Sequence, residues 1–137
     1  MEEFTLNEDI KVFCVKAESF PDKVLEAHQT LHSLIDFNPS RKYFGLSNPD
    51  KNGTIIYKAA AEELIPGELS KHQLEAYTIP KGTYLSILVS NFRNNLEEIG
   101  KAFQKLIARD TIAPDGICIE WYLKNDDVRC MVKKRDH

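Results

Sequence analysis

Short runs rich in β-branched and aromatic residues recur along the chain, separated by clusters of turn-forming residues. Such runs predict β-strands, because branched and aromatic side chains pack well on a pleated surface. The predicted strands cover residues 10–17, 41–47, 54–61, 74–79, 83–90, 117–123 and 128–134. The turn formers Asn-Pro-Asp-Lys-Asn-Gly at 48–53 and Asn-Asp-Asp at 125–127 predict the loops of two hairpins.

Two longer stretches carry apolar residues three or four positions apart and predict helices. The first is expected to open with a Ser19 cap and Pro21 in its first turn, and to end before Pro39. The second is expected to open with Asn95 and Glu98 as a capping-box-like pair. The elements therefore run strand–helix–strand–strand, then a link strand, then strand–helix–strand–strand again.

An internal repeat is indicated by apolar residues that recur 72 positions apart. This offset places Val24, Leu31, Leu34, Ile35, Phe13 and Val15 on Leu96, Phe103, Leu106, Ile107, Leu85 and Ile87. We therefore expect an α+β fold of two pseudo-symmetric repeats, about 8–62 and about 82–134, joined by a link strand at about 72–80. The whole chain, 1–137, is expected to be one domain. Both helices are expected on one face of an antiparallel sheet, with a central cleft on the other.

Composition limits the classes of partner. The 137 residues are 42% hydrophobic and 28% charged, which suits one globular domain. The net charge of −3, without a basic stripe, argues against direct nucleic-acid binding. No apolar run approaches the ~20 residues that cross a bilayer. The acidic segment 1–9 lacks the features of a signal peptide, so a cytoplasmic location and no membrane partner are expected.

Metal and cofactor sites are not indicated. Cys14, Cys118 and Cys130 are odd in number and lack CxxC spacing, which favours small buried thiols. His28 and His32 imitate a metalloprotease spacing, but Gln29 stands where the general-base Glu is required. His28 also lies on the apolar stripe of its helix, as a packed histidine would. We expect no metal and no cofactor.

Strand alternation predicts which side chains face the cleft. The set expected on the helix side is Phe44, Leu46, Leu85, Ile87, Val89, Ile117, Ile119, Trp121 and Leu123. The set expected on the cleft side is Tyr43, Gly45, Tyr84, Ser86, Leu88, Cys118, Glu120 and Tyr122. Tyrosine rings and one carboxylate would suit a flat or cationic organic molecule. The open alternative is an exposed sheet face on which Glu120 and the tyrosines are ordinary cross-strand neighbours. For Lys58 two interpretations stay open: a partner for a cleft carboxylate, or a solvated strand lysine.

Three motifs in order resemble the GyrI-like small-molecule-binding domain, the effector-binding domain of multidrug-sensing transcription regulators. They are Tyr-Phe-Gly-Leu-Ser at 43–47 with Asn-Gly and Ile-Tyr-Lys-Ala-Ala at 56–60, the segment Tyr-Thr-Ile-Pro-Lys-Gly-Thr-Tyr at 77–84, and Ile-Glu-Trp-Tyr at 119–122. The resemblance spans roughly residues 8–134. It implies a pseudo-symmetric α+β fold whose central cleft contains Glu120. Lys81 departs from the family pattern, which has a small residue after the proline, and the segment before Tyr43 is short.

The resemblance implies three functions, which stay open at this point. The first is a stand-alone binding domain, since no helix-turn-helix half precedes residue 10, acting by sequestration or sensing of aromatic or cationic molecules. Its ligand-binding residues would be Glu120, Tyr122, Tyr43, Tyr84, Tyr57 and Lys58. The second is a hydrolase of strained, cyclopropane-bearing electrophiles in which Glu120 activates water. The third is a protein-interaction module that binds a partner protein through its outer surface.

Overall fold

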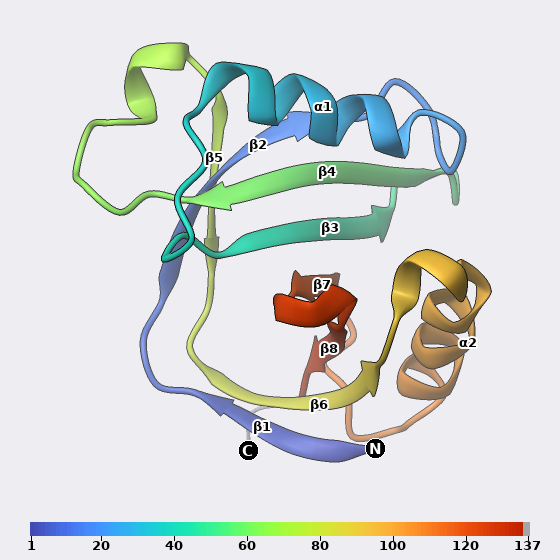
Figure 1. The fold of residues 1–137 in the computed structure, drawn as a ribbon. Coiled ribbons are helices and arrows are strands. Elements are labelled where there is room, and N and C mark those ends of the chain that lie inside the picture. The colour runs from blue at the N-terminus through green and yellow to red at the C-terminus, as the bar shows by residue number, and fades with distance from the viewer. Residues whose placement is uncertain (136–137) are drawn as a thin grey trace. The chain divides into compact units, whose positions relative to one another are not determined.

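The computed structural model describes residues 1–135, and the chain divides into two compact units (Figure 1). One unit is residues 9–79 and contains helix α1, so it is called the α1 unit. The other combines residues 1–8 with the chain from residue 80 onward and contains helix α2, so it is called the α2 unit. The fold is α+β, and the strands within each unit pair antiparallel, as predicted. The pseudo-twofold relation and the single-domain boundaries stay predictions, and positions 136 and 137 of that domain lie outside the described residues.

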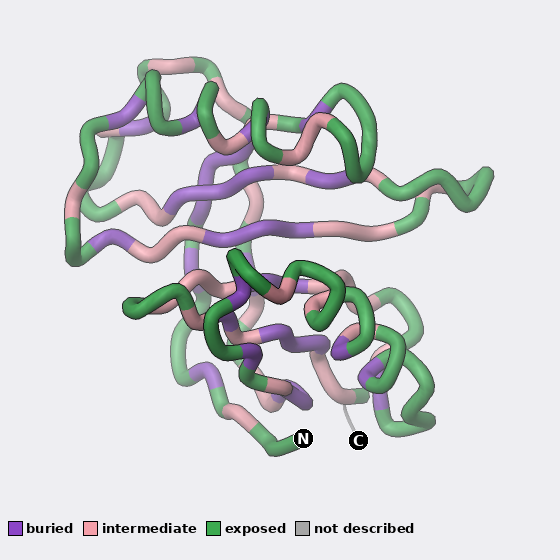
Figure 2. Tube along the Cα trace, turned by 45° about the vertical axis from the view of Figure 1, so that its right-hand side comes forward, coloured by how far each residue is buried: buried purple, intermediate pink, exposed green. Residues whose placement is uncertain are grey.

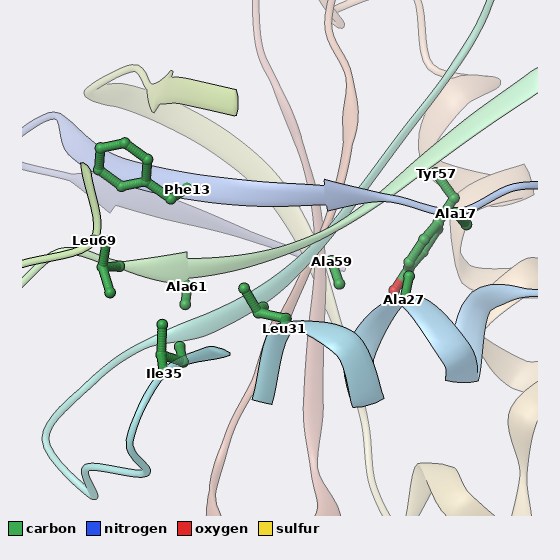
Figure 3. Close-up of a cluster of buried hydrophobic side chains, with 9 residues drawn as sticks. All are labelled: Phe13, Ala17, Ala27, Leu31, Ile35, Tyr57, Ala59, Ala61 and Leu69. Carbon is green, nitrogen blue, oxygen red and sulfur yellow. The ribbon is translucent and has the colours of Figure 1, made fainter. Parts of the chain in front are cut away.

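The α1 unit has four antiparallel strands and one helix. Its elements are β2 (Ile10–Lys16), α1 (Val24–Leu34), β3 (Tyr43–Pro49), β4 (Ile55–Glu62), a 3₁₀ turn η1 (Ser70–His72) and β5 (Glu75–Ile79). The strand order is β3-β4-β2-β5. The core lies between α1 and one face of these strands, as Figure 3 shows. It is built from Phe13, Ala17, Ala27, Leu31, Ile35, Tyr57, Ala59, Ala61 and Leu69.

The α2 unit also has four antiparallel strands and one long helix, and one of its strands comes from the start of the chain. Its elements are β1 (Glu2–Leu6), β6 (Gly82–Val89), a 3₁₀ turn η2 (Phe92–Asn94), α2 (Leu96–Ile107), β7 (Cys118–Tyr122), a 3₁₀ turn η3 (Lys124–Asp126) and β8 (Val128–Lys133). The strand order is β7-β8-β6-β1. The edge strand that β5 supplies to the α1 unit is supplied here by β1, from the other end of the chain.

The core of the α2 unit lies between α2 and the same strands. Its buried members are Leu85, Val89, Phe92, Ala102, Leu106, Ile112, Val128, Cys130 and Val132. In Figure 2 the buried positions follow the strands, whereas the outward surfaces of both helices are exposed. This pattern is that of an amphipathic helix that covers one side of a sheet.

Two expectations about local structure are wrong. The first helix begins at Val24 without a side-chain cap, and the Ser19 hydroxyl donates to Asp22 Oδ1 at 2.6 Å instead. The second helix begins at Leu96 as expected, but Asn95 makes no side-chain capping hydrogen bond, and its amide donates to the Asn91 carbonyl instead. The sequence analysis also gave no strand at residues 2–6, where β1 lies.

Candidate functional site

Glu120 is the buried acid of the α2 unit. It lies on β7 opposite Cys130 of β8, and only 9% of the residue is exposed. Cys118 and Tyr122, two positions away on either side, pack against the core that α2 covers. Because side chains two apart on a strand share a face, Glu120 is directed to the α2 side of the strands.

This placement corrects the face predicted for β7. The sequence analysis put Ile119 and Trp121 against the helix, but the α2 core takes Cys118 and Tyr122 instead. The same reversal applies to β3, where Tyr43 packs against the α1 core and the buried Phe44 and Leu46 alternate with it on the opposite face. The sequence analysis recognised correctly that side chains alternate between two faces, but it assigned the wrong set to the helix side. The reason is that apolar side chains occupy both faces of these strands. On β6 the prediction holds, since Leu85, Ile87 and Val89 pack against the α2 core.

The Glu120 carboxyl has one neutral hydrogen-bond partner. The Tyr122 hydroxyl donates to Glu120 Oε1 at 2.7 Å. Burial raises the pKa of Glu120 above its usual range, and the hydrogen bond from Tyr122 offsets only part of this rise. No cationic side chain among residues 1–135 contributes to this shift. The site therefore favours either a protonated acid or a carboxylate that faces a cation from outside the chain.

A thiol and an aromatic pair surround this acid. Burial raises the pKa of the Cys130 thiol to about 12, and the Glu120 charge acts in the same direction. The Tyr122 ring is 5.4 Å from the Phe92 ring of η2, tilted by 39°. The acid is therefore linked through Tyr122 to a pair of packed aromatic rings.

In the α1 unit, Tyr57 and Tyr43 both lie on the α1 side. The Tyr57 hydroxyl and His28 Nε2 are 2.8 Å apart and hydrogen-bonded, and Tyr57 also stacks on Phe20 with ring centres 5.9 Å apart. Figure 3 shows the Tyr57 side chain directed toward α1. The Tyr43 ring lies 4.9 Å from the His32 ring. The two histidines of the metalloprotease-like spacing therefore each meet a tyrosine.

The remaining two predicted site residues lie on the faces away from the helices. Lys58 Nζ forms an ion pair with Glu75 Oε1 at 2.6 Å, and the Glu75 side chain is 57% exposed. That Lys58 faces a ligand-binding cleft stays a prediction. Tyr84 is fully buried on β6, and its hydroxyl donates to the Pro80 carbonyl oxygen.

The structure thus brings Glu120 and Tyr122 together in the α2 unit. In the α1 unit, Tyr43 and Tyr57 lie on the same face of the strands, toward α1. It does not bring Tyr84 to the side of Glu120, nor Lys58 to the side of Tyr57. The sequence analysis missed Phe92, whose position in a 3₁₀ turn before α2 has no periodic signal. A shallow hollow of about 210 Å³ beside α2 and β6 does not include Glu120 among its lining residues.

Two kinds of sequence comparison give no match. No protein-family model matches the chain. No curated protein matches it either. Within residues 1–135, no helix is long and apolar enough to cross a membrane, and no cluster of three or more His, Cys, Asp or Glu side chains is placed to hold a metal ion.

Several solved structures share the fold over nearly the full length of both chains. An integron cassette protein from the mobile metagenome of Vibrio cholerae has a TM-score of 0.70 at 13% identity, covering 98% of this chain and 95% of that one. SAV2435 bound to tetraphenylphosphonium has a TM-score of 0.60 at 13% identity, covering 96% and 93%. A putative bacterial transcription regulation protein from Staphylococcus aureus MU50 has a TM-score of 0.57 at 13% identity, covering 96% and 97%. A hydrolase from Listeria innocua has a TM-score of 0.59 at 10% identity, covering 98% and 90%. At these identities the likeness shows a shared fold, and function has to be argued from the site.

Proposed function

We propose that the chain is a small-molecule-binding domain of the GyrI-like type, which takes up organic cations that carry aromatic groups, with Glu120 as the charge partner. The observation that carries the proposal is the Glu120 carboxyl, buried, hydrogen-bonded to Tyr122 and without a cationic partner among the described residues. The solved structure of SAV2435 with an organic cation supports it, because that protein shares the fold. The likeness to a putative transcription regulation protein supports a sensing role, with sequestration as the other output.

The chemistry of the site explains why a cation would be preferred. A carboxylate transferred out of water without a partner is costly, so in the free protein the buried Glu120 is biased toward its neutral form. A bound cation would supply the missing charge and favour the carboxylate. A proton and the ligand would then compete for Glu120, and affinity would rise with pH until the carboxyl is fully ionised.

Tetraphenylphosphonium is a suitable probe, since its charge does not change with pH and any pH dependence must come from the protein. Isothermal titration calorimetry would compare the wild type with Glu120→Gln and with Glu97→Gln, a matched change at an exposed position on α2. We expect about tenfold or greater loss of affinity for Glu120→Gln, the scale of a charged contact removed. We expect no change for Glu97→Gln, and affinity that increases from pH 5 to pH 8 in the wild type and in Glu97→Gln but not in Glu120→Gln. Equal affinity in all three proteins would overturn the proposal.

A hydrolase is the second candidate, favoured by the hydrolase from Listeria innocua that shares the fold. An acid with a raised pKa is suited to general acid–base work. Incubation with a cyclopropane-bearing electrophile, followed by mass spectrometry, distinguishes the two candidates. Turnover that Glu120→Gln abolishes would establish the enzyme, whereas binding without product supports the binding domain. A protein-interaction module would show neither ligand binding nor turnover.

A further inference from the structure

Arg129 lies on the face of the α2 unit that is turned away from α2. Its neighbours on β8, Val128 and Cys130, belong to the α2 core, so the alternating Arg129 side chain is directed to the opposite face. Across the strands it lies opposite Trp121 of β7 and Leu88 of β6. Leu88 is 47% exposed, so solvent reaches this edge of the face.

The guanidinium is only partly used by this chain. Nη1 is 3.4 Å from Ser86 Oγ and 3.3 Å from Glu2 Oε1, and both distances are long for a charge-assisted hydrogen bond. Nε is buried and has no hydrogen-bond partner among residues 1–135. The Arg129 side chain is 19% exposed, whereas that of Glu2 is 65% exposed.

The unused atoms form one edge of the guanidinium plane. Nε–H and one N–H of Nη2 are parallel donors, and this fork matches the two oxygens of a carboxylate. Within the described part of the chain, Arg129 donates hydrogen bonds only through Nη1, so the edge formed by Nε and Nη2 has no acceptor. An acceptor at this edge would satisfy a buried donor that otherwise loses its water without replacement.

Aromatic rings flank the same group. The Phe4 ring centre lies 4.4 Å from Arg129 Cζ, in a cation–π contact. The Trp121 ring meets the Phe4 ring edge-to-face, at 5.6 Å and 80°. A flat ring attached to a carboxylate would therefore find apolar surface beside the charged fork.

Arg41 of the α1 unit also has a buried Nε without a hydrogen-bond partner among residues 1–135, but its Nη1 is held by a close carboxylate. Its side chain is 5% exposed, and Nη1 donates to the Glu68 carboxylate and to the Glu62 carbonyl oxygen at 2.7 Å. This ion pair holds the pKa of Glu68 down at about 2. Arg129 has no comparably close carboxylate, since Glu2 is exposed and approaches Nη1 only at 3.3 Å.

We propose that Arg129, Phe4 and Trp121 form a second binding site, for a small aromatic carboxylate. The Nε and Nη2 edge of Arg129 binds both carboxylate oxygens, and the ring of the ligand packs beside Phe4 and Trp121. The site lies on the opposite face from Glu120 and binds a ligand of the opposite charge. This proposal therefore does not depend on the proposed cation site.

Benzoate is the test ligand and benzamide its neutral control of the same shape. Trp121 is the single tryptophan of the chain, so its fluorescence and its indole N–H signal report on this site alone. NMR titration would follow that signal together with the Arg129 Nε–H signal. We expect saturable shifts of both with benzoate, weaker binding of acetate, and no saturable shift with benzamide.

Three variants sharpen the test. Arg129→Lys keeps the charge but removes the fork, and we expect about tenfold or greater loss of benzoate affinity. Glu2→Gln removes the carboxylate that competes for the guanidinium, so affinity should rise several-fold, and this exposed position should tolerate the change. Arg109→Lys, at an exposed position, is the matched control and should bind benzoate as the wild type does. Equal binding of benzoate and benzamide, unchanged affinity in Arg129→Lys, or weaker binding in Glu2→Gln would each overturn the proposal.

Discussion

Glu120→Gln tests whether this one buried carboxyl shapes the pH dependence of folding. Because burial raises the pKa of Glu120 in the folded protein, the folded state holds a proton at pH values where the unfolded chain has released it. The wild type is therefore destabilised as pH rises from about 4.5, the ordinary pKa of the group, through its raised value in the folded state. Gln cannot ionise, yet its carbonyl oxygen can still accept the hydrogen bond that Tyr122 donates.

The size of the expected change in unfolding free energy follows from the one proton that Glu120 binds. One group with different pKa values in the two states changes the free energy of unfolding by at most ~1.4 kcal/mol per pH unit. The difference in unfolding free energy, Glu120→Gln minus wild type, should be constant below pH 4.5 and rise by up to that slope above it. It should level off above the folded-state pKa.

Urea unfolding followed by the fluorescence of Trp121, measured from pH 4 to pH 9, gives this difference directly. Subtracting the two profiles cancels the contributions of all other ionisable groups. Glu97→Gln, at an exposed position on α2, is the matched control for the change from Glu to Gln. A flat or falling difference for Glu120→Gln would refute the reasoning that burial controls this carboxyl.

Three further predictions concern other parts of the chain. Because Arg41 lowers the pKa of Glu68 to about 2, Glu68→Gln should be less stable than wild type above pH 4.5, and urea unfolding should show the deficit vanishing as pH falls toward 2. Leu106→Ala removes a fully buried side chain of α2 and should lower the free energy of unfolding by about 2–5 kcal/mol, whereas Leu96→Ala, 62% exposed on the same helix, should change it by about 0.5 kcal/mol or less. Since the pKa of the Cys130 thiol is about 12, mass spectrometry after iodoacetamide treatment at pH 8 should find Cys130 unmodified in the native protein and modified in urea, and rapid native labelling would contradict its burial.

The local spacing of apolar residues was sufficient to predict most helices and strands of the fold. The alternating runs and the two helical stretches correspond to β2–β8 and to both helices, because the spacing of apolar residues is itself a local property. Segment 2–6 gave no such signal. Its five residues, Glu-Glu-Phe-Thr-Leu, become a strand through pairing with β6 about 80 positions later, which no local window contains.

The candidate site was only partly predictable for a related reason. Glu120 and Tyr122 were expected to share a face, and they do, since that depends only on a spacing of two. Which face they share depends on whether Cys118 or Ile119 meets the helix, and both are apolar. Where both faces of a strand are buried, the hydrophobic pattern alone no longer fixes the phase. The partners of Arg129 come from β1 and β7, so they too required the tertiary fold.

The place of β1 in the α2 unit has a consequence for the order of events on the ribosome. Residues 1–8 are synthesised first, yet their hydrogen-bonding partner, β6, begins at residue 82. The whole of the α1 unit, residues 9–79, is synthesised before that partner. A contiguous unit can fold as it emerges, whereas the α2 unit has to wait until β8 (Val128–Lys133) has also emerged. We therefore expect the N-terminal strand to be the last strand to pair. A nascent chain whose first 79 residues have left the ribosome should contain a folded α1 unit, with residues 1–8 still accessible to protease.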